Sequence, residues 1–147
     1  MYYDARPATI FNGLFDYCTY APRPAYYAMF SWADLRELGT QVKATVDKGA
    51  ATNEVVTAVA ARNVGCDLGI FIARFADDDN VTAAEKVAVR IVGGMFDGRV
   101  RGYLTDEFHL GSPVHLEPDP SGAVSLTLAP NAFVYVETRC KERKDAR

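Results

Sequence analysis

The chain has 147 residues, 49% of them hydrophobic and 24% charged, and its net charge is −3 from 16 basic and 19 acidic side chains. This composition is typical of one globular domain, or of a modest domain with an appendage, and it excludes a disordered chain. The weak negative charge disfavours nucleic acids and anionic membranes as partners, because both attract a basic surface.

The first predicted element is a helix over residues 24–38. Pro24 suits the first helical turn, where its missing N–H costs nothing, and Gly39 suits the position just after a helix end. The helix is rich in aromatic residues and apolar on several sides, with Trp32 near its narrow polar edge. A helix of this kind must be covered on most sides. We therefore expect a partner for it: a missing portion of a larger domain, or a second copy.

Beyond residue 40, the apolar residues alternate as they do in strands. A Pro- and Gly-rich passage over 111–122 is predicted as a connection. Short strands separated by turn signals predict a mainly β protein, an antiparallel β-sandwich over 41–140, preceded by the one long aromatic-rich helix and followed by a charged tail over 141–147. The predicted strands span 41–46, 55–61, 69–76, 86–92, 99–106, 123–129 and 132–138.

Three cysteines, Cys18, Cys66 and Cys140, lie at irregular spacing. An odd count without a CxxC pair argues against a disulfide framework and against a zinc site. The sequence favours free thiols in a reducing compartment, with one pair and one spare cysteine as the alternative. No apolar run reaches the ~20 residues of a membrane span, and no leader pattern opens the chain. We therefore predict a cytoplasmic protein that makes no membrane contact.

Four segments, residues 2–7, 11–16, 22–28 and 38–42, together resemble the C-terminal end of clan A glycoside hydrolases. The closest resemblance is to the β-xylosidase/iduronidase-like group, of the family thirty-nine type. In that group a (β/α)8 barrel is followed by an accessory β-sandwich. The resemblance implies that residues 1–40 are the remnant of a barrel, comprising the end of strand eight, the loop after it and helix eight.

Loops at the carboxyl ends of barrel strands build the active-site face, so residues 4–20 are the part of this chain that the resemblance places near a substrate. Their aromatic rings and planar polar groups suit a carbohydrate. The alternative is structural: Tyr3, Asn12 and Asp16 satisfy loop backbone groups, and Asp4 pairs with Arg6. The candidate substrate-binding residues in the parent enzyme are Tyr3, Asp4, Arg6, Asn12 and Asp16.

Glycoside hydrolysis needs two positioned carboxylates, ~5–5.5 Å apart in retaining enzymes. The resemblance places them after barrel strands four and seven, which this sequence does not contain. The glutamates present fall on the predicted helix, sandwich and tail. We therefore name no catalytic residue and expect no catalysis from this chain alone, although its parent is expected to be a glycosidase.

Two acidic loops contain side chains that could bind a metal ion. The first holds Asp106, Glu107 and His109, with His115 beyond a Gly-Ser-Pro turn, and exposed loop residues explain it better than metal ligands. The second, residues 77–80, lacks the glycine and distal glutamate of a calcium-binding loop. No metal or cofactor is predicted.

The rival hypotheses are a small carbohydrate-binding module and an assembly domain with the helix as its seam. A binding module would need a row of exposed aromatic side chains. Only Phe96, Tyr103 and Phe108 are candidates for such a row, because the other aromatic residues of the predicted sandwich fall at alternating core positions.

Overall fold

The protein is described here by a computed structural model that covers residues 13–47, 54–94, 96 and 99–139. Within these residues, α1 spans Pro24–Leu38, as the sequence predicts. The rest is mainly antiparallel β structure, which confirms the predicted fold class. The strands are β1 (Thr40–Val42), β2 (Glu54–Arg62), β3 (Leu68–Ala76), β4 (Glu85–Val89), β5 (Arg99–Thr105), β6 (Ser112–His115), β7 (Val124–Leu128) and β8 (Ala132–Arg139).

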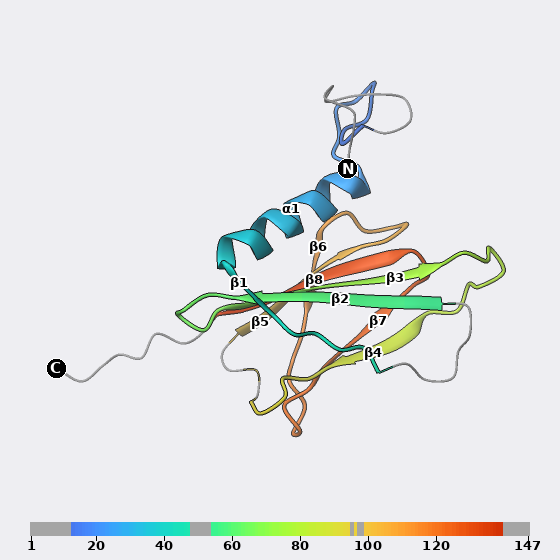
Figure 1. The fold of residues 1–147 in the computed structure, drawn as a ribbon. Coiled ribbons are helices and arrows are strands. Elements are labelled where there is room, and N and C mark those ends of the chain that lie inside the picture. The colour runs from blue at the N-terminus through green and yellow to red at the C-terminus, as the bar shows by residue number, and fades with distance from the viewer. Residues whose placement is uncertain (1–12, 48–53, 95, 97–98, 140–147) are drawn as a thin grey trace.

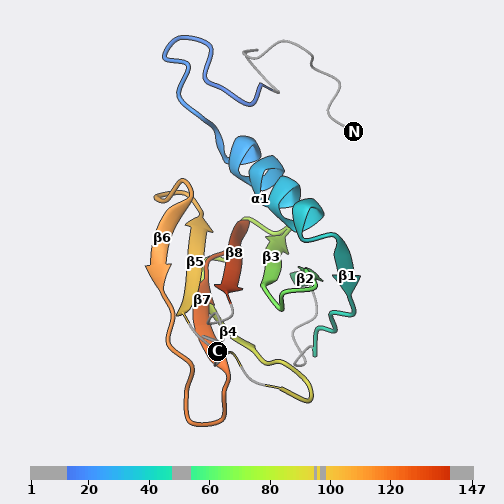
Figure 2. The same cartoon turned by 90° about the vertical axis from the view of Figure 1, so that its left-hand side faces the viewer.

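The strands form two sheets of unequal size. The larger sheet has six strands in the order β1-β2-β3-β8-β5-β6, all antiparallel to their neighbours, and the smaller pairs β4 with β7 (Figure 1). Viewed from the side, α1 lies over one face of the larger sheet and the smaller sheet lies on the opposite side (Figure 2). The molecule therefore has three layers.

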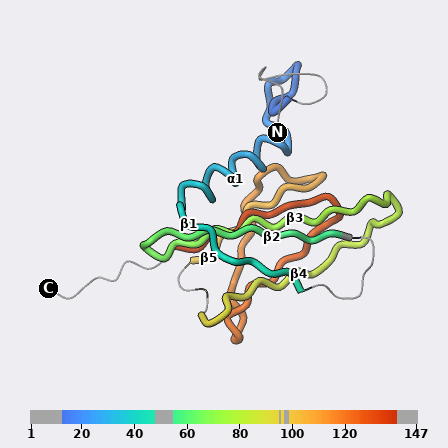
Figure 3. Tube along the Cα trace, viewed as in Figure 1, coloured from blue at the N-terminus to red at the C-terminus, as the bar shows by residue number. Residues whose placement is uncertain are grey.

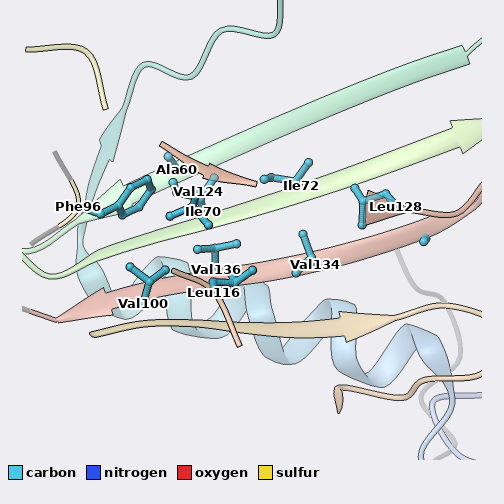
Figure 4. Packing of buried hydrophobic residues seen from close by; sticks show 11 residues of the cluster. Ala60, Ile70, Ile72, Phe96, Val100, Leu116, Val124, Leu128, Val134 and Val136 are labelled. Carbon is cyan, nitrogen blue, oxygen red and sulfur yellow. The ribbon is translucent and has the colours of Figure 1, made fainter. Parts of the chain in front are cut away.

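The main core fills the space between the two sheets. Ile70 lies opposite Val136 and Ile72 opposite Val134 in the β3–β8 register, and all four side chains face the smaller sheet. Leu128 of β7 meets them from the other side and is fully buried (Figure 4). Each such side chain contributes about 1.5–3 kcal/mol on burial, so this core holds the sandwich together.

A buried arginine links the two sheets. The side chain of Arg74 on β3 is inaccessible to solvent. Its Nη1 donates hydrogen bonds to the carbonyl oxygens of Leu128, at 2.7 Å, and Ala83, at 2.8 Å. Its Nε lies 3.8 Å from a carboxylate oxygen of Glu85. Because buried carbonyl groups need donors, Arg74 satisfies one carbonyl group at the end of β7 and one in the segment just before β4.

Helix α1 packs across the outer face of the larger sheet. Gly39 adopts a left-handed conformation with φ of 86°, and its N–H bonds the carbonyl of Arg36, which ends the helix. Leu35 is buried against Ala61 and Tyr135. Gly69 on β3 leaves room for the end of the helix, since a Cβ there would lie 2.8 Å from Cδ1 of Leu38.

Three strand predictions differ from the structure. The first strand ends at Val42 rather than at residue 46, and β4 spans Glu85–Val89 rather than 86–92. Strand β6 lies inside the passage predicted as a connection. This strand contains Pro113, and a strand at the edge of a sheet tolerates proline because one side of it needs no partner.

The cysteines divide into bonded and free. Cys66 is disulfide-bonded, so the prediction of free thiols is wrong at this residue, while Cys18 is free and exposed. Cys140 lies outside the described residues. Disulfides are typical of oxidising compartments, so the bond does not favour the cytoplasmic location, which stays a prediction. No helix in the described ranges is long and apolar enough to cross a membrane.

Candidate functional site

Most of the predicted substrate-binding residues fall where the structure gives no description. Tyr3, Asp4, Arg6 and Asn12 lie outside the described residues, so their role stays a prediction. Asp16 is described, and it lies in the loop that runs from residue 13 to the start of α1.

Asp16 organises this loop. Its Oδ1 accepts hydrogen bonds from the backbone N–H groups of Cys18 and Thr19, at 3.0 and 2.9 Å, and from the Thr19 hydroxyl at 3.0 Å. Its Oδ2 pairs with Nη2 of Arg23 at 3.2 Å. Both carboxylate oxygens are therefore engaged inside the loop, which agrees with the structural alternative and leaves sugar binding by Asp16 untested.

These contacts set the charge of Asp16. The hydrogen bonds from Thr19 and Arg23, and then that from Cys18, lower the pKa of Asp16 to about 2. A depressed folded pKa stabilises the loop above the ordinary value of 3.8, and that stabilisation is lost as the pH falls towards 2. At neutral pH, Asp16 is a carboxylate that accepts hydrogen bonds and does not donate a proton.

The same loop exposes two tyrosines that the sequence analysis did not select. Tyr17 is 58% exposed and Tyr20 is 67% exposed, and Tyr20 has a positive φ of 57°. Amphipathic tyrosine rings are a common means of contact at binding surfaces. The signal that could have found them was their position inside residues 4–20, the range that the resemblance assigns to the substrate.

A second candidate surface lies over α1 and the neighbouring face of the larger sheet. On the helix, Met29 is 51% exposed, Phe30 55% and Trp32 48%. The Trp32 ring centroid lies 6.3 Å from that of Phe71, which is 5.3 Å from that of Phe133. Farther along the sheet, Val55 and Phe75 are cross-strand partners and also exposed. We call these seven residues the outer aromatic surface: Met29, Phe30, Trp32, Val55, Phe71, Phe75 and Phe133.

A polar cluster lies beneath α1 on β5 and β8. The hydroxyl of Tyr103 donates to Oε1 of Glu137 at 3.2 Å, and Nη1 of Arg101 lies 3.7 Å from the same oxygen. Burial, and then the charges of Glu37 and Glu137, raise the pKa of Asp34. Burial also raises the pKa of Tyr135. The hydrogen bond and the ion pair join members of this cluster to one another. We therefore interpret it as polar packing beneath the helix and not as an acid–base pair for catalysis.

The three residues that the rival hypothesis of a carbohydrate-binding module offers as an exposed aromatic row differ widely in exposure. Phe96 is only 6% exposed and belongs to the core between the sheets. Tyr103 is half-buried and bonded to Glu137, while Phe108 stands alone at 83% exposure. These three residues therefore do not form an exposed aromatic row.

The acidic side chains near His109 and His115 make local hydrogen bonds and ion pairs. Asp106 accepts bonds from the backbone N–H groups of Phe108 and His109, and it lies 2.7 Å from the His109 ring. His115 pairs separately with Glu117 at 2.9 Å. Within the described part of the chain, no group of three or more side chains is arranged to hold a metal ion.

Two solved structures share this arrangement. A family 30 endoxylanase from Clostridium papyrosolvens C71 matches 88% of this chain with a TM-score of 0.64 and 18% sequence identity. A family 30, subfamily 8 xylanase from Clostridium acetobutylicum matches 86% with a TM-score of 0.60 and 14% identity. No protein-family model matches the sequence. No curated protein matches it either.

At these identities, the likeness shows a shared fold. The matching part amounts to 31% of each xylanase chain, so this chain spans about a third of their length. Both xylanases are glycoside hydrolases of clan A, in line with the resemblance seen in the sequence. The narrower resemblance, to the family thirty-nine type, finds no support in them.

Proposed function

We propose that this chain is the C-terminal portion of a clan A glycoside hydrolase, in which the β-sandwich braces a catalytic (β/α)8 barrel. The observation that carries the proposal is the coverage of the fold comparison: 88% of this chain matches 31% of a xylanase. The sequence resemblance in residues 2–42 independently suggests the same class of enzyme.

The size of the unmatched part supports this proposal. Since 88% of 147 residues match 31% of the papyrosolvens enzyme, roughly 290 residues of that enzyme lie outside the match, close to the ~250 residues of a (β/α)8 barrel. A barrel is therefore the expected remainder of the parent protein.

The outer aromatic surface is the proposed contact with that barrel. On the side of the sheet away from the sandwich core, the ring of Trp32 contacts Phe71, which contacts Phe133. Met29, Phe30, Val55 and Phe75 are further exposed apolar side chains of α1 and of the sheet. Large exposed apolar areas usually mark an interface. Burying each large side chain contributes about 1.5–3 kcal/mol, so a few of them suffice to fix the sandwich on the barrel.

The catalytic carboxylates would come from the barrel, and this chain alone would not cleave glycosides. The loop that carries Asp16, Tyr17 and Tyr20 precedes α1 and would lie on the barrel's active-site side if α1 is helix eight. Both similar structures are xylanases, so xylan is the first substrate to test with the parent protein.

The test uses the chain expressed together with the in-frame codons that precede it, assayed for reducing sugar released from xylan. The longer protein should hydrolyse xylan, and the 147-residue chain should not. In the longer protein, Phe30→Ser should lower the unfolding temperature, because it removes an interface contact. Phe108→Ser is the control, since Phe108 is 83% exposed in the loop between β5 and β6 and is not one of the residues of the outer aromatic surface. Equal effects of both substitutions, or hydrolysis by the short chain, would contradict the proposal.

A further inference from the structure

The smaller sheet leaves part of the larger one uncovered. Within the described residues, β4 pairs with β7 along one side only. Its other side borders a groove of about 1300 Å³. Residues 42–47 line the groove together with residues 85–92, and the trace in Figure 3 shows 43–47 running from β1 towards β4. We call this groove the β4 slot.

The floor of the β4 slot is mostly apolar. It includes Val56 and Ala58 of β2 and Leu68 of β3, which pack against the main core and remain partly exposed. Along the β4 wall, Val87 and Val89 pack against the same core and remain partly exposed. Apolar side chains that line an open groove gain free energy when another apolar group covers them.

The free side of β4 carries backbone N–H and C=O groups, which a further strand can bond. A strand of five residues is roughly 16 Å long, about 5 Å wide and about 10 Å deep, or roughly 800 Å³. The slot volume of about 1300 Å³ therefore has room for a strand. Strand addition at an open sheet edge combines these backbone bonds with pockets for alternate side chains.

We propose that the β4 slot binds one extended peptide segment with alternating apolar side chains, which pairs with β4 and completes the smaller sheet. A second copy of this chain fits poorly, because its own β4 edge is equally recessed between two walls and a floor. The segment would come from the rest of the parent polypeptide, of which the similar xylanases have about two thirds beyond the match. This source rests on the proposed function, whereas the slot's chemistry does not.

The test measures binding of a fluorescein-labelled peptide, in which valine and threonine alternate between terminal lysines, to the 147-residue chain by fluorescence anisotropy. Hydrogen exchange of the amides of residues 85–92 is followed with and without the peptide. Val87→Lys places a charge in the slot, and Thr127→Lys is the matched control because Thr127 is exposed on the neighbouring strand β7 and is not one of the residues that line the slot. A buried unpaired charge should weaken binding about tenfold or more, and the control should bind like the original chain.

Saturable binding with slower exchange over 85–92 supports the proposal. Binding without that protection would overturn it, as would equal affinities for the two lysine variants or dimerisation through β4. If Val87→Lys does not fold, the exchange measurement on the unaltered chain still decides. The peptide experiment involves no barrel, so its failure would leave the xylan test intact, and failure of the xylan test would remove only the proposed source of the strand.

Discussion

Replacing Gly69 by alanine tests how α1 is seated on the larger sheet. A Cβ at this position would lie 2.5 Å from the Tyr135 hydroxyl oxygen and 2.8 Å from Cδ1 of Leu38. Contacts this short cannot persist, so either the end of α1 or the Tyr135 ring must move. Gly69 does not have a positive φ, so alanine itself meets no backbone strain there.

The magnitude follows from two opposing effects. Overpacking a tight contact lowers the free energy of unfolding by about 1–3 kcal/mol. Alanine also restricts the unfolded chain, which raises the free energy of unfolding by about 0.4–1 kcal/mol. We therefore expect Gly69→Ala to lower the free energy of unfolding by roughly 1–2 kcal/mol. Part of the loss should disappear when Leu38 is also truncated to alanine, because neighbouring substitutions are not additive.

The assay is urea unfolding followed by tryptophan fluorescence. Trp32 is the only tryptophan in the chain, and its ring lies 6.3 Å from that of Phe71 on the sheet, so its emission reports the seating of α1. Gly65→Ala is the control, since Gly65 is exposed in a turn and a Cβ there would meet only the Asn63 side chain, at 3.3 Å. Unchanged stability and emission in Gly69→Ala would refute the proposed seating of the helix.

Three further predictions concern other parts of the fold. Arg74→Ala should lower the free energy of unfolding by about 3 kcal/mol, measured in urea, because two carbonyl groups lose a buried charged donor. If this loss were no larger than the loss on replacing an exposed arginine by alanine, it would contradict the role of Arg74 between the sheets. Asp34→Asn should stabilise the protein at pH 7 but not near pH 3. The raised folded pKa of Asp34 means that its favourable contribution is lost as the pH rises, and equal thermal shifts at both pH values would disprove this. Cys66→Ser, or reduction, should lower the free energy of unfolding by about 2–4 kcal/mol, measured in urea. The folded chain should take up more iodoacetamide after reduction than before it, and equal uptake would contradict the bond at Cys66.

Much of the fold follows from local signals in the sequence. Pro24 and Gly39 bound α1 because one is preorganised for a first turn and the other adopts the left-handed conformation that ends a helix. The long strands β2 and β3 follow from alternation, since one of their faces is buried against the core. The sequence did not predict strand β6, because its four residues include a proline and a strand at a sheet edge depends on pairing with a neighbouring strand.

The candidate sites depend on features that no local pattern carries. Alternation in residues 86–92 predicts a strand with one apolar face, but it does not reveal which strand pairs with it. The position of Phe96 just after the Gly93–Gly94 turn makes it a candidate for exposure, but in the structure its side chain is buried in the main core. The exposure of Trp32 agrees with its position beside the polar edge of the helix, whereas that of Phe75 depends on where α1 crosses the sheet.

The most direct test of the central claim is to translate, in frame, the coding DNA upstream of Met1. The account predicts an open frame of about 290 codons, the size of a (β/α)8 barrel, with alternating strands and helices and carboxylates at the ends of strands four and seven. An in-frame stop codon close upstream would contradict it, because this chain would then have no barrel to brace.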